Sequence, residues 1–119
     1  MDKGIRKVFA PKNVRELPSE WPDDFSDFSK NLWRSVSAYT MTTKERVVSL
    51  ESAVRYIAAH DIAGDMMECG VAAGGSVMAM ALTLMVLGKQ DRSLWLYDTF
   101  EGMPEPTKHD VGRFDTPAM

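Results

Sequence analysis

Two short stretches of this chain combine residue types that can hold a small polar ligand. The first, ECGVAAGGS, runs from Glu68 to Ser76, and the second, LYDTFEGM, runs from Leu96 to Met103. Each reads as a strand end followed by a loop, and Asp98 lies about 20 residues beyond the glycines of the first stretch. In nucleoside-binding halves of open α/β sheets, glycines let the ligand approach the backbone and a carboxylate meets the ribose hydroxyls. The spacing therefore predicts a site for an adenosine-containing cofactor.

The glycine spacing argues against a ligand held by its phosphates. Gly70, Gly74 and Gly75 do not match the G-x-G-x-x-G pattern of dinucleotide sites. A P-loop would need a lysine after its last glycine, and here Ser76 follows directly. Neither phosphate-binding motif is present.

Two carboxylates favour a cationic nucleoside instead. Glu68 and Asp98 are each expected at the end of a strand, where both would face the ligand. Each such charge within about 4 Å of a diphosphate would cost on the order of 1 kcal/mol in water. The same charges attract the ammonium, the sulfonium and the ribose hydroxyls of S-adenosylmethionine. Taken from the residues alone, Glu68 could also point away and cap a neighbouring backbone group.

An aromatic stripe predicts a helix early in the chain. Trp21, Phe25, Phe28 and Trp33 recur on roughly one helical face, and Pro22 suits a first turn. We expect this helix to dock on the core.

A second helix is predicted to begin at a capping box. Thr42 precedes Glu45 by three residues, which is the spacing of that motif. The apolar residues that follow predict a helix of roughly 17 residues with one buried stripe. They are Val47, Leu50, Val54 and Ile57.

The two ligand-binding stretches themselves predict a strand, a helix and a strand. Residues 66–69 and 94–97 read as short strands, and the apolar run 77–87 reads as a buried helix, too short for the roughly 20 residues of a membrane span. A connecting helix of this length implies a right-handed parallel βαβ unit, and hence an α/β fold. The residues after Asp98 are expected to form a loop.

The bulk properties fit one small domain. The chain has 119 residues, an apolar fraction of 45% and a formal net charge of -3, which argues against a nucleic-acid partner. Residues 1–20 are expected to be an extended or mobile lead-in to the domain at 21–119. We expect no signal peptide and no membrane association. A lone cysteine, Cys69, fits a reducing, cytoplasmic location and is interpreted as a buried structural thiol.

Three ordered blocks resemble the macrocin O-methyltransferase family: YTMT at 39–42, ECGVAAGGS at 68–76 and LYDTFEGM with the trailing PEPT at 96–107. The resemblance implies a Rossmann-like class I methyltransferase sheet, truncated to its first parallel βαβ unit with the preceding helices. Residues 21–119 would be the N-terminal part of that domain. The reaction implied is S-adenosylmethionine-dependent transfer of a methyl group to a hydroxyl of a sugar or glycosylated natural product.

The resemblance also implies a set of cofactor-binding residues. Five would shape the pocket for the methionine part of S-adenosylmethionine: Glu68, Gly70, Gly74, Gly75 and Ser76. Asp98 would take the ribose hydroxyls, with Thr99 and Phe100 beside the adenosine. The entrance for cofactor or acceptor would be lined by Tyr39, Met41 and Thr42.

Two departures from the family pattern limit these assignments. Ala72 and Ala73 stand where the family tends to have an aromatic and a basic residue, so contacts made by those side chains are in doubt. Family enzymes are Mg2+-dependent and about twice as long, and we expect the metal ligands and the catalytic base beyond this segment. We therefore assign no catalytic or metal-binding residue and expect the segment alone to be inactive. The nearby acidic and histidine residues are interpreted as part of a flexible loop: His109, Asp110 and Asp115.

Two other readings remain open. The chain could be a non-catalytic fragment or oligomerising module that keeps only the cofactor-binding half, with the aromatic stripe as an interface between copies. It could also use a nicotinamide nucleotide, although the glycine spacing and Glu68 disfavour that reading.

Overall fold

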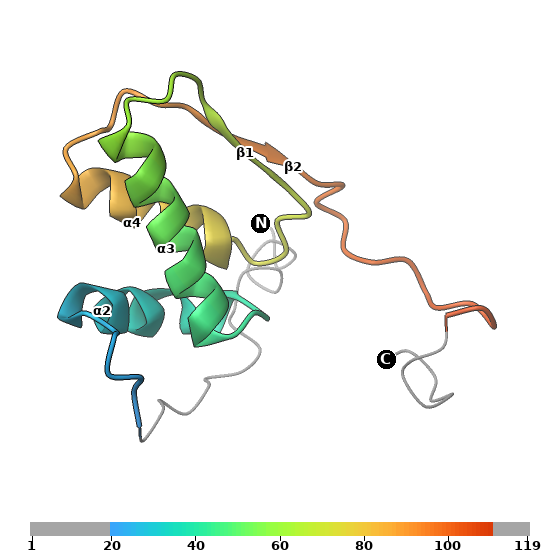
Figure 1. Ribbon diagram of the computed structural model, residues 1–119. Coiled ribbons are helices and arrows are strands. Elements are labelled where there is room, and N and C mark those ends of the chain that lie inside the picture. Colours follow the sequence, from blue (N-terminus) through green and yellow to red (C-terminus); the bar gives the residue numbers. More distant parts are fainter. Residues whose placement is uncertain (1–19, 111–119) are drawn as a thin grey trace, which may run out of the picture.

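The computed structural model describes residues 20–110 of the chain. In chain order the elements are α2 (Asp27–Val36), the short 3-10 helix η1 (Ser37–Tyr39), α3 (Lys44–Ala59), β1 (Met66–Cys69), α4 (Gly75–Val86) and β2 (Leu94–Tyr97). The helices pack together on one side of a two-stranded sheet (Figure 1). The mixed helix and strand composition confirms the α/β class. The expected lead-in at 1–20 lies outside the described residues except for Glu20.

Helix α2 begins later than the aromatic stripe predicted. Its N-cap is Ser26, whose hydroxyl accepts a hydrogen bond from the Ser29 amide at 3.0 Å. Pro22 instead lies in a preceding turn closed by the Phe25 amide and the Pro22 carbonyl, so its placement in the first helical turn was wrong. A serine side chain at the N-cap satisfies an orphan backbone donor, which fixes the start of the helix after Ser26. The stripe does dock on the core as expected, since Phe25 and Trp33 are buried.

The capping box predicted for α3 is also wrong. The N-cap is Thr43, one residue later than expected. The Thr42 amide is instead bonded to the Thr40 hydroxyl at 3.1 Å, in a local turn that precedes the helix. The helix itself is confirmed at 16 residues, with Val47 and Val54 buried along its apolar stripe.

The two strands lie side by side and run parallel, as the βαβ pattern predicted. Met66 pairs with Leu94 and Cys69 pairs with Tyr97, so both strands end at the same edge of the sheet. Helix α4 connects them and covers one sheet face. On that face Met66 is buried, whereas its neighbour Met67 on the other face is 64% exposed.

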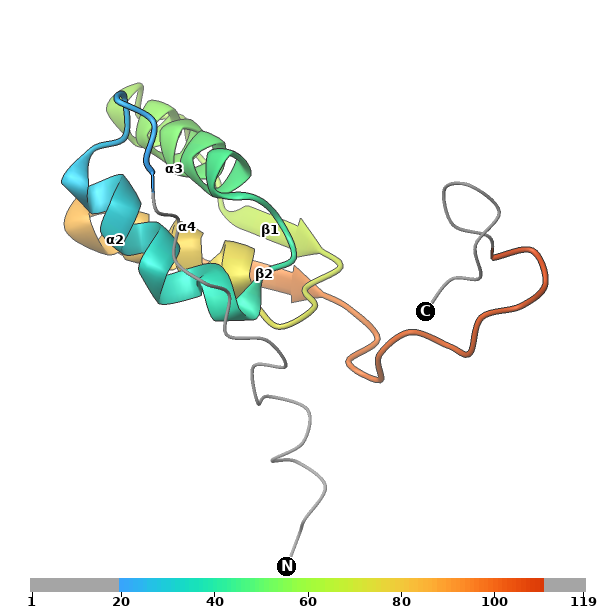
Figure 2. The ribbon, with the colours of Figure 1, turned by 90° about the horizontal axis from the view of Figure 1, so that it is seen from below.

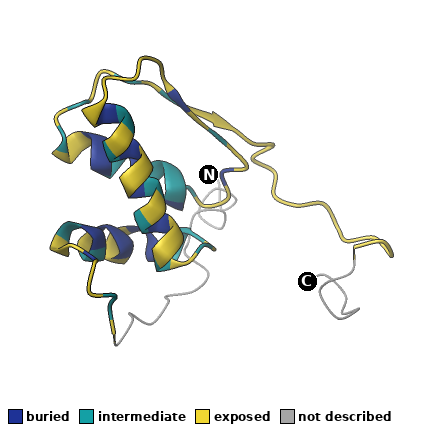
Figure 3. Ribbon diagram, in the orientation of Figure 1, coloured by how far each residue is buried: buried dark blue, intermediate teal, exposed yellow. Residues whose placement is uncertain are grey.

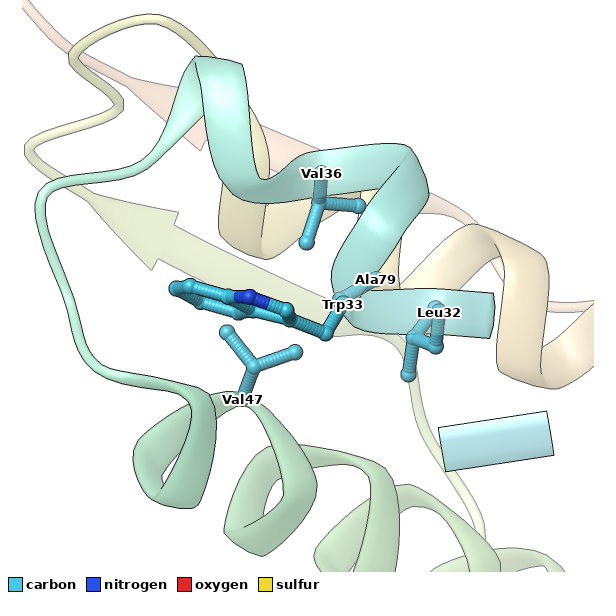
Figure 4. Close-up of a cluster of buried hydrophobic side chains, with 5 residues drawn as sticks. All are labelled: Leu32, Trp33, Val36, Val47 and Ala79. Carbon is cyan, nitrogen blue, oxygen red and sulfur yellow. The ribbon is translucent and has the colours of Figure 1, made fainter. Parts of the chain in front are cut away.

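Within residues 20–110, the core has two clusters of buried side chains that meet at α4. One joins α2, α3 and α4 through the side chains drawn in Figure 4: Leu32, Trp33, Val36, Val47 and Ala79. The other joins α3, α4 and β1 through Val54, Met66, Met80 and Leu84. Helix α4 is therefore the element that ties the helical layer to the sheet.

The opposite sheet face is open to solvent, since Met67 and Trp95 on that face are exposed. In Figure 3, β2 is coloured mostly as exposed. Cys69 is exposed, so its interpretation as a buried thiol was wrong; the pleat turns every second side chain of β1 outward. Residues 98–110 contain no helix or strand and run away from the body of the molecule (Figure 2), which confirms the expected loop. Among residues 20–110, no helix is both long and apolar enough to cross a membrane.

Candidate functional site

Asp98 follows the last residue of β2 and reaches across to the loop that follows β1. Its Oδ2 accepts a hydrogen bond from the Val71 amide at 2.6 Å and a longer one from the Ala72 amide at 3.4 Å. Its Oδ1 accepts from the Phe100 amide at 3.0 Å. We call residues 70–74 the glycine loop and residues 98–100 the aspartate loop. The two loops predicted to hold a ligand thus meet at one carboxylate.

These contacts favour the ionised form of Asp98. The pKa of its carboxyl group is lowered from the ordinary value, first by the Phe100 amide and then by the Val71 amide. The group is exposed, and a carboxylate has about four lone-pair sites. Asp98 therefore remains a negatively charged acceptor at the edge where both strands end.

Glu68 lies one residue before the end of β1 and pairs with Leu96 of β2. Alternation along the strands puts Glu68 and Leu96 on one face of the sheet, and Asp98 follows the last residue of β2 at the edge where both strands end. The Glu68 Oε2 atom is buried and has no hydrogen-bond partner among the described residues. A buried carboxylate oxygen without a donor is costly, and a ligand carrying N–H groups would satisfy it.

Gly75, the first residue of α4, lies directly against the 39–42 segment. A Cβ atom at this position would lie 2.5 Å from the Thr40 Cβ and 2.7 Å from the Tyr39 carbonyl oxygen. Only a residue without a side chain allows this approach. The structure thereby brings the first sequence block onto the second, 35 residues later.

The other loop residues have distinct positions. Gly70 donates its amide to the Tyr97 carbonyl at 2.8 Å, which extends the pairing of the strands by one residue. Gly74 is the N-cap of α4 with φ at +87°, a left-handed conformation that favours glycine. Ser76 is partly buried in the first turn of that helix. The glycine loop thus delivers the N-terminus of α4, with its unpaired amides, to this edge of the sheet.

The predicted entrance residues lie next to the start of α4. Tyr39 ends η1 and touches Gly75 through its backbone. Thr40 and Thr42 share a hydrogen bond between their hydroxyls at 3.1 Å, and Met41 between them is 79% exposed. The 39–42 segment therefore lies against the first residue of α4, and its role as an entrance stays a prediction.

The two residues predicted beside an adenosine follow Asp98 in the aspartate loop. Phe100 is 63% exposed and has a positive φ of 57°. The Thr99 hydroxyl lies 3.5 Å from Asp98 Oδ1. Both residues belong to the loop that Asp98 anchors.

Several functional contacts could not be expected from residue types. Asp98 contacts the backbone amides of Val71 and Ala72, and residue types do not reveal such contacts because every residue except proline has this amide. Asp65 was also missed: its carboxylate accepts from the Ser93 amide at 3.0 Å and from the Trp95 indole at 2.9 Å, which joins the starts of both strands. The Trp95 indole contributes most to lowering the pKa of Asp65.

Two hollows of about 320 and 370 Å³ lie elsewhere on the described surface, and no predicted site residue lines either of them. Within residues 20–110, no three His, Cys, Asp or Glu side chains come together as ligands of a metal ion would. The site described above is therefore an open edge built from two loops and the 39–42 segment.

Comparison with known proteins identifies relatives of this chain. A model of the macrocin O-methyltransferase (TylF) family matches residues 11–116. A tetracenomycin 4'-O-methyltransferase of Streptomyces olivaceus, named for a substrate with a dimethoxy-rhamnosyl group, is 41% identical over 73 residues, which is 61% of this chain and 28% of that protein.

Two further relatives have similar coverage. Demethyldecarbamoylnovobiocin O-methyltransferase of Streptomyces niveus is 30% identical over 94 residues, 79% of this chain and 31% of that protein. Mycinamicin III 3''-O-methyltransferase of Micromonospora griseorubida is 32% identical over 73 residues, 61% of this chain and 29% of that protein. The match to this chain thus spans about three tenths of the length of each of these three relatives.

Proposed function

Because the chain belongs to the macrocin O-methyltransferase family, we propose that it forms the cofactor-binding part of an S-adenosylmethionine-dependent O-methyltransferase. Its acceptor would be a hydroxyl of a sugar or of a glycosylated natural product, the class to which the named substrates of its relatives point. The parallel strands and their connecting helix would belong to a Rossmann-like sheet, and residues 21–119 to the N-terminal part of that domain.

One observation carries the proposed place of binding: the Asp98 carboxylate meets the glycine loop at the edge where two parallel strands end. Ligands of open α/β sheets bind at the carboxyl ends of the strands. Asp98 is charged and exposed, which suits an acceptor for ribose hydroxyls. The unsatisfied Oε2 of Glu68 suits the ammonium of the methionine part.

The residues present fit this cofactor better than a diphosphate nucleotide. Two carboxylates at the edge where both strands end would repel phosphates and attract a cation. When bound, S-adenosylmethionine supplies an electrophilic methyl group on its sulfonium. The part of this chain is to hold and orient it, with the 39–42 segment at the side where an acceptor would enter.

No Mg2+ site is proposed for residues 20–110, because the described side chains form no ligand cluster. The Mg2+ dependence that the family resemblance implies stays a prediction about residues outside that range. A cytoplasmic location and assembly into homo-oligomers also stay predictions.

Thermal unfolding of the 119-residue chain with added nucleosides tests the proposed cofactor. Saturating S-adenosylhomocysteine is expected to raise the midpoint, because a ligand that binds only the folded state stabilises it. NAD at the same concentration is expected to leave it unchanged. A rise with NAD and none with S-adenosylhomocysteine would overturn the proposal in favour of a nicotinamide enzyme.

A further inference from the structure

Three residues other than glycine have a left-handed backbone in the described part of the chain: Asp61, Ala72 and Phe100. Two of them flank the candidate site, with φ of 49° at Ala72 and 57° at Phe100. This conformation is unfavourable for residues with a Cβ atom, and it persists only where surrounding contacts impose it.

Both residues donate their amide to the same carboxylate. Phe100 bonds Asp98 Oδ1 at 3.0 Å, and Ala72 contacts Oδ2 at 3.4 Å beside the shorter bond from Val71. The Val71 bond joins residues 27 positions apart in the chain, and the Val71 residue is 7% exposed. Asp98 is thus the shared acceptor of two loops that each contain one unfavourable backbone conformation.

We propose that Asp98 is a positioning residue that holds the glycine loop and the aspartate loop together before any ligand arrives. The carboxylate joins the loops through one oxygen each, Oδ2 to the Val71 amide and Oδ1 to the Phe100 amide. Its two longest contacts, from the Ala72 amide at 3.4 Å and the Thr99 hydroxyl at 3.5 Å, are the ones that ligand hydroxyls would replace. Only the identity of the ligand bound between the loops depends on the proposed function. The bonds themselves require no ligand.

Amide hydrogen exchange of the ligand-free, full 119-residue chain tests the role directly. Exchange at Val71 and Phe100 is expected to be at least about tenfold faster in Asp98→Ala than in the original chain, since their shared acceptor is lost. An Asn side chain offers one acceptor oxygen, so Asp98→Asn is expected to keep protection in one loop only.

Asp110 provides a matched control. It is another exposed aspartate, and its Oδ2 accepts from the Thr107 amide at 2.6 Å within a single turn. Asp110→Ala is expected to leave exchange at Val71 and Phe100 unchanged. Unchanged exchange at both amides in Asp98→Ala, or full protection of both in Asp98→Asn, would overturn the positioning role.

A double-mutant cycle gives a second readout that a general loss of stability would not produce. Ala72→Gly removes the unfavourable left-handed alanine, so its effect on the unfolding midpoint should be more favourable with Asp98 present than in the Asp98→Ala background. Equal effects in both backgrounds would contradict the proposal.

The outcomes separate this inference from the proposed function. If Asp98→Ala loses protection but the chain does not bind S-adenosylhomocysteine, the positioning role is supported and the proposed cofactor is contradicted. If the chain binds S-adenosylhomocysteine but Asp98→Ala leaves protection unchanged, the proposed cofactor is supported and the positioning role is contradicted.

Discussion

Single backbone groups decide the geometry of the candidate site. The sequence identifies Asp98 and the glycines, because a carboxylate and flexible loops are visible as residue types. It does not reveal that the first partners of Asp98 are the Val71 and Phe100 amides, since every residue except proline carries such a group. Likewise the role of Gly75 against Tyr39 depends on a contact between segments far apart in the chain.

Gly75→Ala is expected to destabilise the fold. Alanine is favoured over glycine inside a helix by about 1 kcal/mol, whereas forcing extra volume into a packed contact costs about 1–3 kcal/mol. The added Cβ would lie 2.7 Å from the Tyr39 carbonyl oxygen, and backbone atoms cannot swing aside as a side-chain end can. The steric cost therefore exceeds the gain in helix propensity, and urea unfolding should give a lower free energy of unfolding for Gly75→Ala than for the original chain.

Ser76→Ala, one residue along the same helix, is the control and should change the free energy of unfolding much less. If Gly75→Ala were as stable as the original chain, the close approach of the 39–42 segment would not hold in solution.

At the scale of elements, the types were predictable and the helix starts were not. Strands 66–69 and 94–97 were predicted at the residues where the structure places them, because short apolar runs between turn residues have few alternatives. The observed starts of α2 and α3 differ from the predicted ones because several residues near each start could cap the helix. Ser26 caps α2 through its own hydroxyl, and Thr43 is the N-cap of α3 without a side-chain hydrogen bond, and the apolar pattern encodes neither.

Helix α4 carries the clearest prediction at this scale. Leu84 is 3% exposed in the cluster that joins the helices to β1, so Leu84→Ala should lower the free energy of unfolding by about 2–5 kcal/mol. Met85, the next residue, is 57% exposed, and Met85→Ala should change it by no more than about 0.5 kcal/mol. Denaturant titration measures both. Similar losses in the two variants would mean that α4 is rotated about its axis relative to the sheet.

At the scale of the whole molecule, the described fold has a covered and an open side. Met67 and Trp95 lie on the sheet face that no helix of residues 20–110 covers, and they are 64% and 53% exposed. Parallel sheets are ordinarily covered on both faces. The sequence predicted the strands but could not indicate that this face would stay open, because apolar strand residues look alike whichever face is covered.

Stability of the whole chain is expected to fall in acid. Within residues 20–110, the carboxyl groups with a lowered pKa are Glu45, Asp65, Asp98 and Asp110. A folded-state pKa below the unfolded value contributes stability that is present above the unfolded value, about 4 for these groups, and is lost as the pH falls through the folded value. The free energy of unfolding should therefore be flat near neutral pH and decline below about pH 4.

Asp65→Asn isolates one contributor to this decline. The variant loses the charged acceptor of the Trp95 indole and the Ser93 amide, so it should be less stable than the original chain at pH 7 and lose less between about pH 5 and 3. Urea unfolding at a series of pH values measures both. An identical acid-dependent loss in the two proteins would show that Asp65 does not contribute to it.

The contrast between two tryptophans gives the molecule its own optical reporters. Trp33 is 4% exposed inside the helical cluster, so its emission should shift to longer wavelength when the helices separate. Trp95 is half exposed, and its indole bonds a carboxylate that becomes protonated in acid. In a Trp21→Phe variant, which removes the third tryptophan of the chain, the emission intensity of Trp95 would follow the strand starts while the emission wavelength of Trp33 follows the core, without any attached dye.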